Sequence, residues 1–239
     1  GRARREGTRP LRQKLHEEVK RTVHQEEFQK LEAAWRGLQY LGNNTESDAQ
    51  LKVRVLNVSK QDLGKTLKRF KGTAWDQSPL FKKLYEEEYG QFGGEPYGTI
   101  IGDYHFDHSP QDVELLTEMA QVAAASHAPF ISAASPSLMQ MESWQELANP
   151  RVLTKIVSTQ EYAAWRSLRA SDDARPIGLC MPRFLARLPF VAPTRPAEAI
   201  VFEQDTEGAT PATHTWATAA CATPVNLHLA LTDSGRRSP

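Results

Sequence analysis

Between residues 51 and 182, segments with the two-residue periodicity of a strand alternate with segments that have the apolar spacing of a helix. Residues 51–58, LKVRVLNV, begin with apolar and basic side chains in strict alternation, which is typical of a strand with one solvent-facing side. Further strands are expected near residues 98–106, 129–133 and 177–181. The alternation predicts an α/β fold, with a mixed sheet that is at least partly parallel and flanked by helices.

Serine residues mark most of the expected helix starts. A serine N-cap accepts a hydrogen bond from a free backbone amide, and proline is tolerated in the first helical turn. A carboxylate three residues after the serine completes a capping box. These signals occur at Ser59 with Asp62, Ser78-Pro79, Ser109-Pro110, Ser143 with Glu146, and Ser158 with Glu161.

A long helical segment is expected before the first strand, over residues 11–41. Its apolar spacing slips near Val23, which predicts a break or two stacked helices. A continuous helix would span about 45 Å, longer than a small domain can cover, so we expect a partner-binding element carrying Leu31, Trp35 and Leu38. The alternative is that the helix folds back at the slip and buries its own stripe. The basic residues before it, GRARREGTRP, are expected to form a solvated tail.

Trp75 lies in a loop beside proline, in KGTAWDQSP. A loop tryptophan can anchor a protein interface or cover the core of its own domain. Trp75 is therefore a further candidate for the partner interface, with the core-covering role as its alternative.

The segment GDYHFDHSPQDVELL, residues 102–116, has the residue types of a metal or acid–base site. Zinc or non-haem iron could use the side chains of Asp103, His105, Asp107 and His108. However, alternate side chains along a strand are nearly 7 Å apart, so a second element would have to complete such a site. The alternative is a structural joint, with Ser109 as N-cap and Asp112 near the free amides. We expect the joint, and therefore no catalytic, cofactor-binding or metal residue.

Composition and missing motifs exclude several other functions. The formal net charge is zero, so no global field favours nucleic acid or an anionic membrane. No apolar run approaches the roughly 18–20 residues of a membrane helix, and no signal-peptide core follows the basic start. Two cysteines are too few for a disulfide framework. Nucleophile-elbow, phosphate-loop and dinucleotide-binding motifs are also missing.

Several stretches taken together resemble a known family. EEFQKLEAAWRGLQYL, LKVRVLNVSKQDLGKTLKRFKGTAWDQSPLFKKLYEEEYGQFGGEPYG, GDYHFDHSPQDVELL, HAPFISAASPSLM and SWQELANPR closely resemble the large subunit of the type VI secretion contractile sheath, the TssC/VipB family. The resemblance runs from about residue 26 to 189. It implies a phage-tail-sheath-like fold and no catalytic residues.

The resemblance also implies partners and a location. Such proteins pair with a small sheath subunit, TssB/VipA, and the heterodimers polymerise around a tube of Hcp rings on a baseplate. Contraction powers effector delivery, and a ClpV-type ATPase recycles the contracted sheath. The implied location is the cytoplasm of a Gram-negative bacterium, on a membrane-anchored baseplate.

The sequence suggests three parts: a helical partner-binding segment at 1–45, an α/β core at 46–188, and a divergent, partly disordered segment at 189–239. Family members are about twice as long, so we interpret the chain as a truncated form. The main hypothesis is a structural sheath subunit. The alternatives are a fragment that only binds the small subunit, and a metal-dependent hydrolase at residues 103–108.

Overall fold

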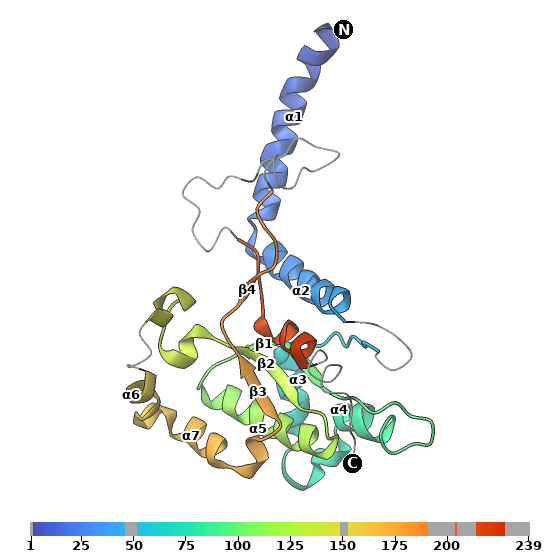
Figure 1. Cartoon of the computed structure of the whole chain (residues 1–239), viewed down its shortest axis with the longest axis vertical. Coiled ribbons are helices and arrows are strands. Elements are labelled where there is room, and N and C mark those ends of the chain that lie inside the picture. Colours follow the sequence, from blue (N-terminus) through green and yellow to red (C-terminus); the bar gives the residue numbers. More distant parts are fainter. Residues whose placement is uncertain (1, 46–51, 149–152, 191–203, 205–213, 228–239) are drawn as a thin grey trace. The chain divides into compact units, whose positions relative to one another are not determined.

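The computed structural model describes residues 2–45, 52–148, 153–190, 204 and 214–227. They form two compact units (Figure 1). The first unit comprises Gly1–Tyr40 and Phe184–Ala217, and the second comprises Leu41–Arg183 and Thr218–Pro239. The three-part division expected from the sequence stays a prediction.

Two helices and a short strand pair make up most of the first unit. Helix α1 spans Arg2–Val23, and α2 spans Glu26–Asn43, so that its last turn enters the second unit. The helical segment is interrupted at His24 and Gln25, close to the predicted slip in apolar spacing. The expectation of two helices is therefore confirmed. Strand β4 (Phe184–Leu185) pairs antiparallel with β5 (Trp216–Ala217).

A parallel sheet forms the centre of the second unit. Its strands are β1 (Ile100–Phe106), β2 (Phe130–Ala134) and β3 (Ile177–Cys180), in the order β1-β2-β3. Ile100 lies opposite Phe130 in the first pair, and Phe130 lies opposite Ile177 in the second. Parallel strands require crossover connections. The predicted α/β class and three of the four expected strands are confirmed.

Helices precede and connect these strands. Before β1 lie α3 (Lys60–Arg69), η1 (Gly72–Gln77) and α4 (Pro79–Phe81), which continues as the π-helical turn η2 (Lys82–Glu86). Helix α5 (Pro110–Ala125) connects β1 to β2. The connection from β2 to β3 contains η3 (Pro136–Met139), η4 (Trp144–Ala148), α6 (Leu153–Val157), η6 (Gln160–Tyr162), α7 (Ala163–Ala170) and η7 (Asp172–Ala174).

The core lies between α5 and one face of the sheet. Phe106 and Phe130 from the strands pack with Leu116 and Met119 from α5, and all four are almost fully buried. The side chains that alternate with them, such as Ile131 and Ala133, are on the opposite face.

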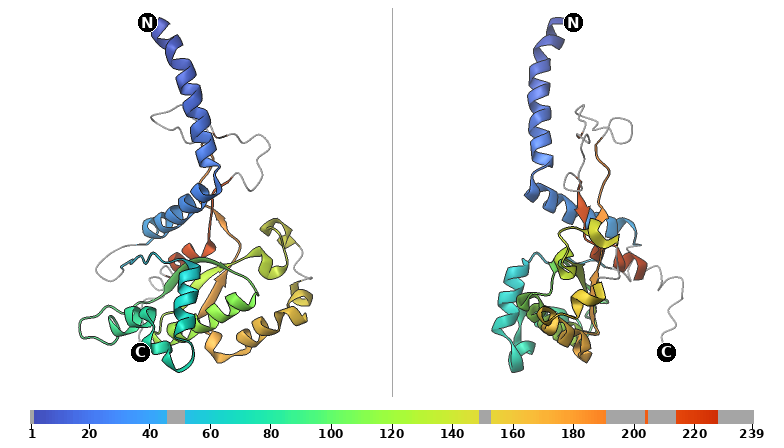
Figure 2. Two further views of the ribbon diagram at one scale, coloured as in Figure 1. Left: turned by 180° about the vertical axis from the view of Figure 1, so that it is seen from behind. Right: turned by 90° about the vertical axis from the view of Figure 1, so that its left-hand side faces the viewer.

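Residues 218–227 cover that opposite face. They contain η9 (Ala219–Cys221) and a helical turn at 223–227, and η9 contacts all three strands. Figure 2 shows this red segment on the side of the sheet away from α5. Ala220 and Val225 are buried there. The segment that the sequence analysis called divergent thus supplies one of the two layers over the sheet.

Residues 52–58 depart from expectation, because they belong to no strand. Their basic side chains are engaged instead: Lys52 pairs with Glu95, and Arg54 pairs with Glu88 and Glu95. The Tyr104 hydroxyl donates to the Val58 carbonyl at 2.8 Å. The predicted strand is therefore wrong over these residues. Leu51 lies outside the described part.

The cap predictions had mixed outcomes. The side chains of Ser59, Ser78 and Ser109 all accept a backbone amide hydrogen, as predicted. At the predicted box of Ser143 and Glu146, the Glu146 carboxylate accepts from the Ser143 amide at 3.2 Å. The helix that follows Ser143 is the 3-10 helix η4. The predicted box at Ser158 and Glu161 is wrong: Thr159 is the N-cap residue, and Glu161 bonds to distant side chains.

Candidate functional site

The segment after β1 is organised by hydrogen bonds of the strand–helix turn. The Ser109 hydroxyl accepts from the Asp112 amide, and the Ser109 amide donates to the Asp107 carboxylate at 2.8 Å. Burial alone would raise the pKa of the Asp107 carboxyl, but the hydrogen bonds from Ser109 hold it below its ordinary value. Both side chains thus serve the backbone of the turn.

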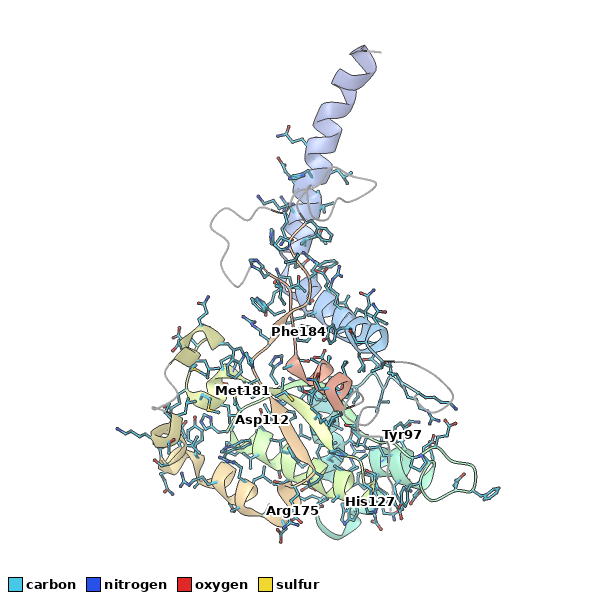
Figure 3. The ribbon with its side chains drawn as sticks, viewed as in Figure 1. Tyr97, Asp112, His127, Arg175, Met181 and Phe184 are labelled. Carbon is cyan, nitrogen blue, oxygen red and sulfur yellow. The ribbon has the colours of Figure 1, made fainter. Side chains whose placement is uncertain are left out.

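Asp112, labelled in Figure 3, connects this turn to α3. Its carboxylate accepts from the Asp107 amide at 2.8 Å and pairs with Lys60 at 2.7 Å. The Lys60 ammonium also donates to the His105 carbonyl and lies 4.4 Å from the centre of the Phe106 ring. A cation at the end of β1 is held by the strand, the turn and α5 together.

The His108 side chain also makes structural contacts. Its ring stacks on Tyr162, with centroids 4.1 Å apart, and its Nε2 atom lies 2.8 Å from Glu161. Tyr162 is fully buried and donates to the Leu138 carbonyl. His108 therefore connects the β1–α5 turn to the helices before β3.

The four candidate metal ligands do not converge. Asp103 and His105 lie on the face covered by residues 218–227, where Asp103 accepts from the Thr218 hydroxyl at 2.9 Å. Asp107 and His108 are engaged in the turn and at Tyr162. Within the described residues, no group of three or more histidine, cysteine or carboxylate side chains is arranged to hold a metal ion. The joint therefore holds the side chains of Asp107 and His108, whereas Asp103 bonds to Thr218 and the His105 side chain is exposed.

An apolar stripe lies on α2 in the first unit. Leu31 is 57% exposed and Trp35 is 65% exposed, one helical turn apart. Leu38 continues the stripe and is partly buried, while Phe28 one turn earlier is exposed at its margin. Exposed apolar side chains that lie next to one another can mark a protein interface. We call Leu31, Trp35 and Leu38 the α2 stripe.

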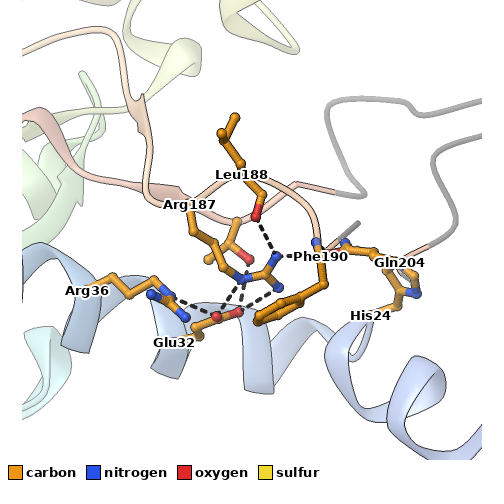
Figure 4. A network of polar contacts seen from close by, with 8 residues as sticks. His24, Glu32, Arg36, Arg187, Leu188, Phe190 and Gln204 are labelled. Atoms are coloured by element: carbon orange, nitrogen blue, oxygen red, sulfur yellow. Dashed lines mark hydrogen bonds and ion pairs between the residues drawn. The ribbon is translucent and has the colours of Figure 1, made fainter. Parts of the chain in front are cut away.

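A buried ion pair connects α2 to the segment that follows β4 within the same unit (Figure 4). The Arg187 side chain, only 1% exposed, donates to both carboxylate oxygens of Glu32, at 2.6 and 3.1 Å. Arg36 and Thr215 also donate to Glu32. Burial alone would raise the pKa of the Glu32 carboxyl, but these hydrogen bonds outweigh it and lower the pKa below its ordinary value.

This pair was missed by the sequence analysis. Glu32 and Arg36, at the i,i+4 spacing of a helical ion pair, were the one local signal for it. Arg187 follows 155 positions after Glu32 in the chain, and no periodic pattern connects the two. Through this pair, the segment that contains Arg187 contacts α2 at Glu32.

Trp75 lies in η1 and is partly buried. Its ring meets Phe81 edge-on, with centroids 5.0 Å apart, and packs against the core of the second unit. These contacts favour the core-covering role, and its place in a partner interface stays a prediction.

Comparison with known proteins places this architecture among contractile tail sheaths. The family model described as "EvpB/VC_A0108, tail sheath N-terminal domain" (VipB) matches residues 8–236. The chain therefore belongs to the VipB tail-sheath family, and the match includes the terminal regions that the sequence analysis had judged divergent.

The chain is also similar to one curated protein of the type VI secretion sheath. The chain is 66% identical over 215 residues to the "Type VI secretion system sheath protein TssC1" of Pseudomonas aeruginosa. The alignment covers 90% of this chain and 43% of the relative, so the chain spans less than half of that protein's length. Among the described helices, none has the length and apolar content needed to cross a membrane.

Proposed function

We propose that the chain is a structural subunit of a type VI secretion contractile sheath, acting by assembly and without catalysis. The observation that carries this proposal is the exposed α2 stripe in a chain of the tail-sheath family. Among the candidate enzyme side chains, Asp107 bonds to the turn, Asp103 bonds to the sheet cover and His108 stacks on Tyr162. The functional surface is therefore an interface.

The partner that we assign to the α2 stripe is the small sheath subunit. An amphipathic helix with leucine and tryptophan at i and i+4 suits side-to-side packing with another apolar helix. The Glu32–Arg187 pair holds α2 at a position about a quarter of a turn from the stripe, so the stripe is presented by a restrained helix. Restraint lowers the entropy lost on binding.

The wider assembly follows from the same proposal. Neighbouring heterodimers, an Hcp tube and a baseplate would contact the polymer, and a ClpV-type ATPase would act on its contracted form. The proposed location is the cytoplasm. Leu31, Trp35, Leu38 and Trp75 remain the proposed interface residues.

A second candidate is a binding module that pairs with the small subunit without polymerising. The α2 stripe supports this candidate as well, because the stripe could bind the small subunit whether or not the heterodimers polymerise.

The test is co-expression with the small sheath subunit of the same organism, followed by size-exclusion chromatography and negative-stain microscopy. Filaments would support the structural subunit, and a discrete complex without filaments would support the binding module. Failure of the two folded proteins to co-elute would contradict both.

A further inference from the structure

The loop between η2 and β1 presents a phenylalanine to solvent. Phe92 is fully exposed, more so than any other large apolar side chain among the described residues, and Tyr89 in the same loop is 45% exposed. Residues 89–94, YGQFGG, carry no charge. Single exposed apolar residues are common on protein surfaces, so Phe92 points to a contact only if the loop holds it in place.

The base of this loop is closed by polar contacts. The Glu88 carboxylate accepts from the Glu95 amide at 3.0 Å, and Arg54 pairs with the carboxylates of both residues. Gly94 allows the two sides of the loop to meet, since a Cβ atom there would lie 2.0 Å from the Glu88 carbonyl oxygen. The loop therefore presents Phe92 on a restrained backbone, which lowers the entropy lost on binding.

The charges next to Phe92 are acidic. Residues 84–98 contain four carboxylates and no cation, and Glu86 and Glu87 are exposed. Lys83 is 4.0 Å from Glu87 in an exposed pair, which contributes little. An anionic membrane surface would repel these carboxylates. The complementary surface is therefore a protein groove with an apolar part and basic side chains at its edge.

A groove of this kind lies on the same chain, between α3 and α5, with a volume of about 510 Å³. Gly64, Leu67 and Leu115 supply its apolar part. Lys65 and Lys68 also line it, with 76% and 71% of their side chains accessible. Their nearest carboxylates are 3.9 and 3.5 Å away, and exposed pairs of this kind contribute little. Both lysines can therefore bind other carboxylates.

The acidic side chains of the groove do not cancel these two lysines. Asp112 pairs with Lys60 at 2.7 Å, and Glu114 pairs with Lys71 at 2.6 Å. Glu118 is only 6% exposed, and burial raises the pKa of its carboxyl. The charges that the groove presents to solvent are therefore mainly basic.

We propose that the Phe92 loop of one copy docks in the α3–α5 groove of a second copy. The Phe92 ring packs on the apolar part of the groove and on the alkyl stems of the two lysines, whose ammonium groups are attracted to an aromatic face. The chain already contains one such contact, since the Lys60 ammonium lies 4.4 Å from the centre of the Phe106 ring. Glu86 and Glu87 then face the two lysines.

The contact joins two different surfaces of one chain, so each copy can offer its loop to one neighbour and its groove to another. Heterologous contacts of this type close into rings or continue as open chains. The α2 stripe takes no part in this contact, and the assignment of the small sheath subunit to that stripe is independent of it.

The experiment is sedimentation equilibrium of the full chain at increasing concentration. We expect the average mass to rise with a dissociation constant below about 1 mM, and high salt to weaken the association. Phe92→Ser should weaken it at least about tenfold, without loss of folding, because the ring is exposed. A constant monomer mass up to about 1 mM would overturn the proposal, and so would wild-type association of Phe92→Ser.

Charge reversal distinguishes this contact from association through any other surface. The variant Lys65→Glu, Lys68→Glu has an acidic groove beside its acidic loop, and the variant Glu86→Lys, Glu87→Lys has a basic loop beside its basic groove. Each variant alone should stay monomeric. Their mixture should associate, because each acidic surface then meets a basic one. A mixture that stays monomeric, with both variants folded by circular dichroism, would contradict the docking.

Two controls complete the test. Lys155→Glu with Arg169→Glu makes the same change of charge at exposed positions of α6 and α7 and should associate as the wild type does. Loss of association in this variant would show a general effect of charge and would overturn the proposal. Binding of the wild type, but not of Phe92→Ser, to phosphatidylcholine–phosphatidylglycerol vesicles would assign the loop to a membrane instead.

Discussion

Gly102 in β1 leaves space for the ring of Phe130. A Cβ atom at this position would lie 2.6 Å from the Phe130 ring, which is almost fully buried. Gly102→Ala should therefore lower the free energy of unfolding by about 2 kcal/mol, as overpacking does. Gly42→Ala is the matched control, since a Cβ there meets nothing within 4 Å. Urea unfolding measures both, and equal stability of the two variants would contradict this packing.

Ser109 tests the joint after β1. Ser109→Ala should cost about 1 kcal/mol, the usual loss for an N-cap, because the Asp112 amide loses its acceptor. His105→Ala and His108→Ala should show no metal-dependent defect. Metal analysis of the purified chain checks this: stoichiometric zinc or iron that both histidine variants lose would favour the metal site instead.

At the scale of elements, the Glu32–Arg187 pair should make the attachment of α2 depend on pH. The pKa of Glu32 is lowered on folding, so its stabilisation is fully present above the unfolded pKa, about 4.3, and is lost as pH falls through the folded value. Protection of the α2 amides from hydrogen exchange, relative to the intrinsic rate at each pH, should fall at acidic pH, and Glu32→Gln should reduce that dependence. Glu26→Gln, which alters an exposed pair with Lys30, is the control. An unchanged pH profile in Glu32→Gln would contradict this role.

Elements with local causes were predictable from the sequence. The caps at Ser59, Ser78 and Ser109 depend on residues within three positions, and the break near Val23 follows from apolar spacing. A strand needs a partner, however, and residues 52–58 have none within the described chain. The Glu161 side chain does not form its predicted capping box, because it bonds to His108, which is 53 positions away in the sequence.

The candidate site divides in the same way. Leu31, Trp35 and Leu38 could be chosen from helical spacing. Arg187 could not, because its partner lies 155 positions earlier.

For the molecule as a whole, residues 218–227 should be essential to the second unit, because they cover one face of its sheet. Val225→Asp places a charge at a buried position and should lower the free energy of unfolding by about 3 kcal/mol or more. Leu227→Asp, at an exposed position of the same turn, should have little effect. Thermal unfolding compares them, and equal stability would show that this cover contributes little.

The central claim is that the α2 stripe is the contact with the small sheath subunit. The most direct measurement is co-purification of the small subunit with the double variant Leu31→Asp, Trp35→Asp. Lys30→Asp with Gln39→Asp is the control, since it adds two acidic residues at exposed polar positions of the same helix. Circular dichroism must first show that both variants are folded. The account predicts that the stripe variant loses the small subunit and that the control retains it. Wild-type recovery of the small subunit by the folded stripe variant would contradict it.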